Sequence, residues 1–240
     1  MSFDLNQTVR DVAVENPAST RIFEKFGIDY CCGGGKSLRE ACQAANIAPE
    51  KLLQSLQAAN QPKSGKGKQD WNSAPLAELV DHIVETHHAF TREELDRLDP
   101  LLAKVCSVHG QRHPELLRIQ QLFAGLAHEL TMHMMKEEQV LFPYVVRMEE
   151  AVLERRPVMP PMFGTVRNPV QMMIHEHDSA GQALHEMREL SGGYTAPQDA
   201  CVSFQTLYRA LDELERDLHQ HIHLENNILF PRAVQMEAGH

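Results

Sequence analysis

The apolar residues of this chain recur every three or four positions over long stretches, which is the period of α-helices that bury one face. The clearest example lies near the C-terminus, where one stripe reads Leu207, Leu211, Leu214, Leu218, His221, Glu225 and Ile228. Three further stretches show the same period, and no stretch alternates apolar and polar residues as a half-buried strand does. The pattern therefore predicts an all-α protein.

Proline, serine and glycine residues give these helices approximate ends. The expected helices run from Pro75 to about Val108, from Pro114 to about Glu150, from Asn168 to Ser191, and from near Pro197 to about Met236. Pro100 is expected to break or kink the first of them. Because long helices joined end to end bury their apolar faces against one another, we predict an up-down-up-down four-helix bundle.

The first part of the chain has a different organisation. Thr8 is placed to cap one short helix, and Ser37 with Glu40 forms a capping-box pattern at the start of another. Residues 59–70 are mostly polar, contain glycine and are basic, as flexible linkers often are. The sequence thus predicts a small helical domain (1–58), a linker (59–70) and the four-helix bundle (71–240).

Composition narrows the classes of function. The 240 residues carry a formal net charge of −10 at pH 7, so we expect neither nucleic acid nor an anionic membrane as a partner. No apolar run approaches the ~18 residues of a transmembrane helix, and the N-terminus lacks a secretory-signal pattern. Five cysteines, of which Cys31 and Cys32 are adjacent, do not resemble a disulfide framework. A reducing, cytoplasmic location is therefore expected.

A short motif that occurs twice carries the strongest chemical signal. His133-Met-Met-Lys-Glu137-Glu-Gln-Val-Leu-Phe-Pro143 is followed 88 positions later by His221-Ile-His-Leu-Glu225-Asn-Asn-Ile-Leu-Phe-Pro231. Residues four apart lie on the same face of a helix, so each motif places one imidazole beside one carboxylate. Both pairs lie on the apolar stripes of their helices. Each motif therefore predicts half of a metal site in the core.

The two remaining helices each offer a histidine on the apolar face. His177 lies on the stripe of the third helix, whereas the period of the first helix does not choose between His87 and His88. His88 precedes His133 by 45 residues, and His177 precedes His221 by 44. This matched spacing predicts two halves related by a pseudo-twofold axis, with four histidines and two glutamates at one level of the core.

The residue types indicate which metal belongs there. A mixture of imidazole and carboxylate ligands suits non-haem iron or manganese, and zinc is an alternative. A single inward histidine is more often a structural core residue than a ligand. Two inward carboxylates are different, because a buried and unpaired carboxylate costs several kcal/mol. Two metal ions bridged by the glutamates would explain both.

These motifs, together with Asp29-Tyr30-Cys31-Cys32-Gly33-Gly34 and the segment that begins at Trp71, resemble the iron–sulfur cluster repair proteins, a di-iron family. The resemblance spans nearly the whole chain and implies a haemerythrin-like bundle with two non-haem iron ions, joined by an oxo or hydroxo bridge. It also implies repair of iron–sulfur clusters damaged by nitrosative or oxidative stress, through iron donation or through handling of nitric oxide. It selects His88 on the first helix, and the implied ligands are His88, His133, Glu137, His177, His221 and Glu225.

Four further residues are weaker candidates. Glu129 lies one turn before His133, and Glu176 directly precedes His177, so either could line a path for protons or iron. An exposed acidic residue is the alternative for each. Cys31 and Cys32 could act in redox exchange, in metal handling or in contact with a partner, although a purely structural turn is also possible.

Three functions share the same predicted geometry. The first is repair of iron–sulfur clusters, with damaged iron–sulfur proteins as partners. The second is binding or sensing of nitric oxide at the di-iron centre, and the third is an enzymatic reduction of nitric oxide. Sequence does not separate them, so whether the protein is an enzyme stays open. A homodimer is a further expectation.

Overall fold

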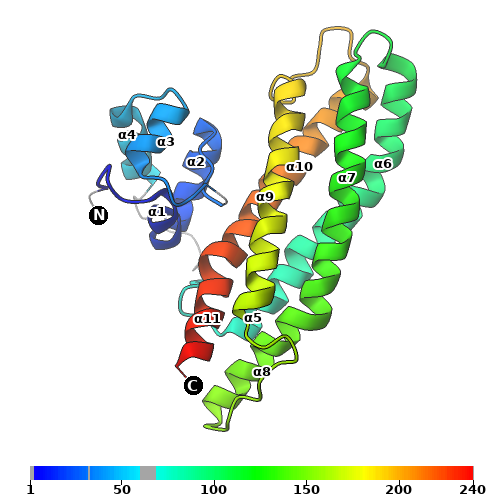
Figure 1. Cartoon of the computed structure of the whole chain (residues 1–240). Helices are drawn as coiled ribbons and strands as arrows, with labels where there is room; N and C mark the ends of the chain where they lie inside the picture. Colours follow the sequence, from blue (N-terminus) through cyan, green and yellow to red (C-terminus); the bar gives the residue numbers. More distant parts are fainter. Residues whose placement is uncertain (1–2, 32, 60–68, 240) are drawn as a thin grey trace.

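The computed structural model describes residues 3–31, 33–59 and 69–239, and it places a compact group of short helices beside one long bundle (Figure 1). Within these residues all regular elements are helical, and Thr8–Ser37 is an isolated β-bridge. The predicted all-α architecture is confirmed. No helix among the described residues has both the length and the apolar character needed to cross a membrane.

Two of the N-terminal helices begin at the caps that the sequence predicts. The N-terminal helices are α1 (Val9–Glu15), η1 (Pro17–Ser19), α2 (Thr20–Phe26), α3 (Leu38–Ala44) and α4 (Pro49–Ala59). Thr8 caps α1, and Ser37 with Glu40 makes both hydrogen bonds of a capping box at the start of α3. Gly27 ends α2 with a φ of 65°, a left-handed conformation that glycine adopts without strain. Buried side chains such as Phe23, Tyr30 and Leu52 form a core of their own.

Four long helical rods make up the bundle. The first consists of α5 (Leu76–His82), η2 (Ile83–His88) and α6 (Ala89–His109), and the second of α7 (Glu115–Lys136), η3 (Glu137–Leu141) and α8 (Phe142–Leu153). The third is α9 (Arg167–Leu190), and the fourth consists of α10 (Val202–Leu224), η4 (Glu225–Leu229) and α11 (Phe230–Ala238). Helix α6 packs on α7 and α10, while α7 packs on α9.

Three of the four rods contain a short π-helical segment, namely η2, η3 and η4. Such segments are uncommon and occur frequently at functional sites. Pro143 and Pro231 follow η3 and η4 at the start of the next α-helical segment, where a missing N–H group is tolerated. By contrast, α6 continues as one α-helix through Pro100, so of the expected break or kink at that proline a break is not found.

Two carboxylates cap the starts of bundle helices that are distant from them in the sequence. Glu149 is buried in α8 and accepts hydrogen bonds from the backbone N–H groups of Leu76 (2.7 Å) and Ala77 (2.9 Å) at the start of α5. Glu237 near the C-terminus accepts a hydrogen bond from the Val166 N–H group (2.9 Å) beside the start of α9. Side chains distant in sequence therefore satisfy the orphan donors at these helix starts.

The bundle core has two apolar layers. One layer includes Leu98, Phe123 and Leu211, and the other includes Leu79, Val145 and Phe230. Between them the rods carry the buried histidines and glutamates of both repeated motifs. The apolar layers on either side separate this polar level from water.

The small domain contacts the bundle through the side of α10 and η4. The Asn227 side chain donates a hydrogen bond to the Tyr30 carbonyl oxygen (3.1 Å) and lies 2.8 Å from His223 Nδ1. The Tyr30 ring meets the His223 ring edge-on, with centroids 5.5 Å apart. The buried His223 side chain therefore faces the small domain. Most of the predicted linker, residues 60–68, lies outside the described residues.

Candidate metal centre

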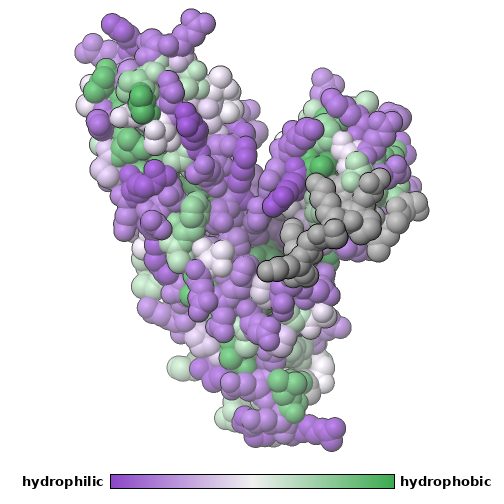
Figure 2. Space-filling view, turned by 180° about the vertical axis from the view of Figure 1, so that it is seen from behind, coloured by the Kyte–Doolittle hydropathy of each residue, from purple (hydrophilic) through white to green (hydrophobic). Residues whose placement is uncertain are grey.

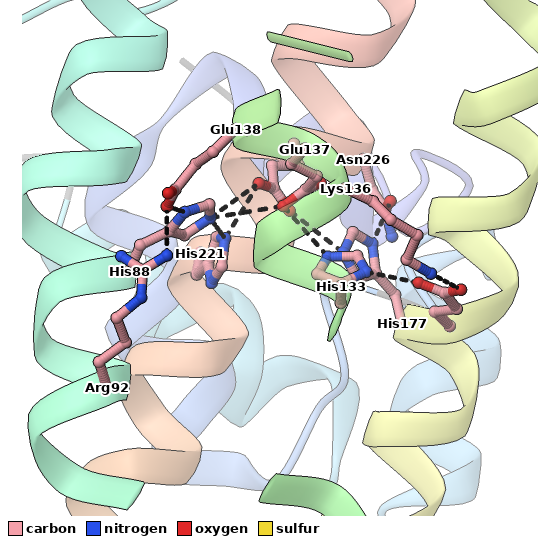
Figure 3. A network of polar contacts seen from close by, with 11 residues as sticks. His88, Arg92, His133, Lys136, Glu137, Glu138, His177, His221 and Asn226 are labelled. Atoms are coloured by element: carbon pink, nitrogen blue, oxygen red, sulfur yellow. Dashed lines mark hydrogen bonds and ion pairs between the residues drawn. The ribbon is translucent and has the colours of Figure 1, made fainter. Parts of the chain in front are cut away.

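Six side chains from all four rods converge at the level of the π segments (Figure 3). Each of them is at least 98% buried, and both glutamates are fully inaccessible to solvent. They come from η2, α7, η3, α9, α10 and η4, and they are His88, His133, Glu137, His177, His221 and Glu225. The duplicated motif therefore brings its histidines and glutamates together, as the matched spacing predicts.

The six side chains divide into two sets of four that share both glutamates. His88 and His221 form one set with Glu137 and Glu225, while His133 and His177 form the other, and the ligand atoms within each set lie within 4.8 Å of one another. The Nε2 atoms of His88 and His221 are 3.1 Å apart. Those of His133 and His177 are 3.0 Å apart. Each carboxylate thus faces two pairs of imidazoles.

The distances suit two cations. An ion with ligand bonds of about 2.1 Å holds neighbouring donor atoms about 3 Å apart when its bonds are at right angles. In the structure Glu137 Oε2 lies 3.2 Å from His133 Nε2 and 3.4 Å from His88 Nε2. Glu225 Oε2 lies 3.1 Å from His177 Nε2, and Glu225 Oε1 lies 2.9 Å from His221 Nε2.

The carboxylate oxygens also lack the hydrogen bonds that a structural role would require. Both oxygens of Glu137 and Oε2 of Glu225 are buried without a hydrogen-bond partner. Imidazole nitrogens lie 3.2 Å from Glu137 Oε2 and 3.1 Å from Glu225 Oε2, yet neither oxygen has a hydrogen-bond partner. Unsatisfied buried carboxylates are costly, and coordination of a cation removes that cost. The residues present therefore fit a pair of metal ions.

Three outer side chains orient three of the four imidazoles. Nδ1 of His88 donates to Glu138 Oε1 (2.7 Å), and Nδ1 of His133 donates to Glu176 Oε2 (2.9 Å). Nδ1 of His177 lies 2.8 Å from Asn226 Oδ1 and donates to it. A proton fixed on Nδ1 leaves the lone pair of Nε2 directed at the shared centre, which is how outer partners prepare histidine ligands.

His221 is the exception. Its Nδ1 atom is buried without a hydrogen-bond partner. The ring of His87 stacks on the His221 ring at 5.7 Å, and His87 Nδ1 lies 3.0 Å from Asp217 Oδ1. His87 is thus buried next to the centre but belongs to neither ligand set. His88 belongs to one of them, although helix periodicity alone does not choose between these two histidines.

The charges of the buried groups compensate one another. Burial lowers the pKa of His88, but the adjacent Glu137 and Glu225 carboxylates outweigh burial and raise it to about 10. Burial also opposes the charge of His133, and Glu137 raises the pKa of that imidazole to about 9. Although burial favours their neutral forms, the adjacent imidazoles lower the pKa of both glutamates. A cation at this level would compete with the protons of His88 and His133.

Comparison with known proteins places these features in a family. Residues 79–233 match the Hemerythrin HHE cation binding domain, and residues 5–60 match a Domain of Unknown function (DUF542). The chain is 37% identical over 234 residues to a probable iron-sulfur cluster repair protein of Haemophilus influenzae, with 98% of this chain and 99% of that protein covered. The chain belongs to the iron–sulfur cluster repair protein family.

Other members of the repair family match over the same extent. The iron-sulfur cluster repair protein YtfE of Escherichia coli O157:H7 is 35% identical over 233 residues, which cover 97% of this chain and 98% of that protein. The protein of the same name from Citrobacter koseri is 35% identical over 238 residues, which cover 99% of this chain and all of that protein. The resemblance inferred from the motifs is thereby confirmed, as is the haemerythrin-like bundle.

The two glutamates proposed to line a path occupy different surroundings in this repair-family chain. Glu176 is 28% exposed and bonds both to His133 and to the Lys136 ammonium group. Glu129 is exposed and accepts a hydrogen bond from the Ser179 hydroxyl (3.2 Å). Glu138 and Asn226 were not singled out from the sequence. Both directly follow a motif glutamate, so alignment of the two repeats could have identified them.

Cys31 is buried in the small domain, where its backbone N–H group and its thiol both donate to Asp29 Oδ1 (2.9 and 3.2 Å). It lies at a cleft of about 970 Å³ that also touches Arg21, His219 and Gln220, and so joins the small domain to the side of α10. Figure 2 shows a gap between the two parts with mostly hydrophilic walls. Cys32 lies outside the described residues.

Proposed function

We propose that this protein holds two iron ions at the buried histidines and glutamates and repairs damaged iron–sulfur clusters by supplying iron. The observation that carries the proposal is the sharing of Glu137 and Glu225 between two pairs of imidazoles. Support comes from relatives that are named iron-sulfur cluster repair proteins and that match over almost their whole length. The matching cation-binding domain covers the residues that form the centre.

In this proposal each ion takes two imidazoles, and the two carboxylates bridge the pair. A carboxylate can bind two ions through its two oxygens, whereas an imidazole in this tautomer offers one lone pair. The mixture of nitrogen and oxygen ligands suits iron in preference to soft, thiolate-binding metals. Bound iron would supply exchangeable metal and open coordination positions for a small ligand or an oxo or hydroxo bridge.

The chain's own residues provide the binding and its orientation. Glu138, Glu176 and Asn226 fix the tautomers of His88, His133 and His177. Glu138 also bonds to Arg92 (2.7 Å), as Glu176 does to Lys136, and both carboxylates are 28% exposed. These two glutamates therefore connect buried ligands with the surface, and we place the path for iron or protons beside them.

Metal content tests the first half of the proposal. Protein purified from iron-replete cells should contain about two iron ions per chain, and Glu137→Leu or Glu225→Leu should lose both together, because each carboxylate serves both ions. Glu150→Leu, which changes an exposed glutamate on α8, is the control and should retain the iron. Purification of the wild type with zinc alone, or without metal, would contradict the proposal.

Transfer of iron tests the second half. Iron-loaded protein mixed with an iron–sulfur enzyme damaged by nitric oxide should restore that enzyme's activity while losing its own iron. The Glu137→Leu variant should not restore it. A spectral change on addition of nitric oxide, with the iron retained and no recovery of the enzyme, would instead favour binding or sensing of nitric oxide. Many turnovers of nitrous oxide formation would favour the enzymatic alternative.

The remaining parts of the proposal concern organisation and context. We propose that residues 1–58 and 71–240 are separate domains joined by the linker at 59–70. The partners would be damaged iron–sulfur proteins, and the cysteine pattern favours the cytoplasm. Roles for Cys31, Cys32 and Glu129, and formation of a homodimer, stay predictions that substitution and measurement of the solution mass would test.

A further inference from the structure

A second group of side chains of the types that bind metals lies at one end of the bundle, away from the buried centre. His109 is the last residue of α6, and His113 lies in the connection to α7, while Asp199 and Cys201 lie in the connection between α9 and α10. Both connections are at the same end of the rods (Figure 1). His113 and His133 are separated by 20 residues of mostly helical chain, or about 30 Å at 1.5 Å per residue. This group is therefore distinct from the buried centre.

The four side chains already meet in two pairs. His109 Nε2 lies 3.2 Å from Cys201 Sγ, and His113 Nε2 lies 3.1 Å from Asp199 Oδ1. Two ligands of a tetrahedral zinc ion lie about 3.6 Å apart for sulfur and nitrogen and about 3.4 Å apart for nitrogen and oxygen, given the usual bond lengths. Each pair is thus close to the spacing of two ligands on one ion.

The two pairs are also near each other. The rings of His109 and His113 have centroids 6.4 Å apart, and both pack against the ring of Phe204, at 5.3 and 5.4 Å. Two imidazoles on one tetrahedral ion have centroids about 5 Å apart, from bond lengths of about 2.1 Å. No three of the four ligand atoms lie within 4.8 Å of one another, so binding of one ion requires the two exposed connections to move closer together.

The surroundings leave these side chains available to an ion. Cys201 is the N-cap residue of α10, and its side chain makes no capping hydrogen bond. Glu115 Oε1 lies 3.2 Å from His113 Nδ1, as an outer partner of a histidine ligand does. Cys201 and Asp199 are exposed, so the site is accessible to an ion.

We propose that His109, His113, Asp199 and Cys201 bind one divalent cation of the zinc class. Zinc binds thiolate, imidazole and carboxylate ligands, and the two histidines, four residues apart, have a spacing found in zinc sites. Four protein ligands leave no open position, so the site is structural. The ion would fasten the α6–α7 connection to the α9–α10 connection at the end where no peptide segment links the two halves of the bundle.

Cobalt(II) is the probe, because cobalt bound to a thiolate gives an intense near-ultraviolet absorption that the sulfur-free buried centre cannot produce. With the iron-loaded full-length protein we expect this absorption to saturate at one equivalent of cobalt per chain and to disappear when zinc is added. Cys201→Ser should abolish it. His113→Gln should weaken cobalt binding at this site at least tenfold, since one of four ligands is lost. His185→Gln, an exposed histidine on α9, is the control and should change nothing.

Several results would overturn the proposal. No thiolate absorption, or absorption that persists in Cys201→Ser, would exclude Cys201 as a ligand. Absorption lost in Cys201→Ser but unaltered in His113→Gln would show adventitious binding by an isolated thiol. Thermal unfolding provides a second readout: zinc should raise the unfolding midpoint of the wild type more than that of Cys201→Ser. An equal rise in both proteins would also reject the site.

Discussion

Glu138 and Asn226 occupy equivalent positions in the two halves of the bundle, and each accepts a hydrogen bond from Nδ1 of the lone histidine of its own half. The distances are 2.7 Å from His88 to Glu138 and 2.8 Å from His177 to Asn226. Each residue directly follows the glutamate of a repeated motif. The duplication therefore includes the groups that orient the ligands as well as the ligands themselves.

Removal of these orienting groups should weaken metal binding without removing a ligand. Glu138→Ala and Asn226→Ala should each lower iron affinity by roughly 10–100-fold, because the imidazole then loses the bond that fixes its tautomer. Titration of the metal-free protein with ferrous iron measures the effect. Gln139→Ala, an exposed neighbour of Glu138, should leave affinity unchanged. Equal affinities for all three variants would contradict this role.

Asn227 should have a different effect from its neighbour Asn226. It bonds to the Tyr30 carbonyl and lies beside His223, so Asn227→Ala should loosen the small domain while iron binding persists. A larger radius of gyration in small-angle scattering and faster proteolysis near the linker are the expected results. Asn226→Ala should show neither. If both variants kept the wild-type radius, this contact would not determine how the small domain sits.

The buried cap at the start of α5 should contribute measurably to stability. Glu149→Ala leaves the N–H groups of Leu76 and Ala77 without their acceptor, and the loss should be about 1–2 kcal/mol, as for other helix caps. Urea unfolding of the metal-free protein provides the measurement. The adjacent Glu150→Ala changes an exposed carboxylate of the same helix and should stay within about 0.5 kcal/mol of the wild type.

Acid should weaken the cap that Glu237 provides at the start of α9. Burial alone would raise the pKa of Glu237, but hydrogen bonds from Thr165, Val166 and Tyr144 lower it below the ordinary value of 4.5. A carboxyl with a lowered pKa in the folded state stabilises the fold fully above its ordinary pKa, and this contribution is lost as pH falls below 4.5 through the folded-state value. The free energy of unfolding should therefore decrease less over this pH range in Glu237→Gln. Parallel curves would contradict the prediction.

The helix period and the duplicated motif were enough to predict the bundle and to place His133, Glu137, His177, His221 and Glu225 in its core. Periodicity did not choose between His87 and His88, because neighbouring residues on a helix can both face inward. The partners of Glu149 and Glu237 lie more than 70 residues away, so no local pattern indicates those caps. The bundle-facing stripe also does not indicate that His223 contacts the small domain on another side of α10.

The π segments change how the rods must be aligned. A π segment contains one residue more than the α-helical turn it replaces, and one residue corresponds to a rotation of about 100° around a helix. If the same residues formed a continuous α-helix through η3, Phe142, Val145 and Met148 would turn out of their apolar layer. The polar level therefore sets the rotational phase between the two apolar layers along three rods. Deleting one residue there would remove the π segment and shift the ligands while leaving both apolar layers in phase.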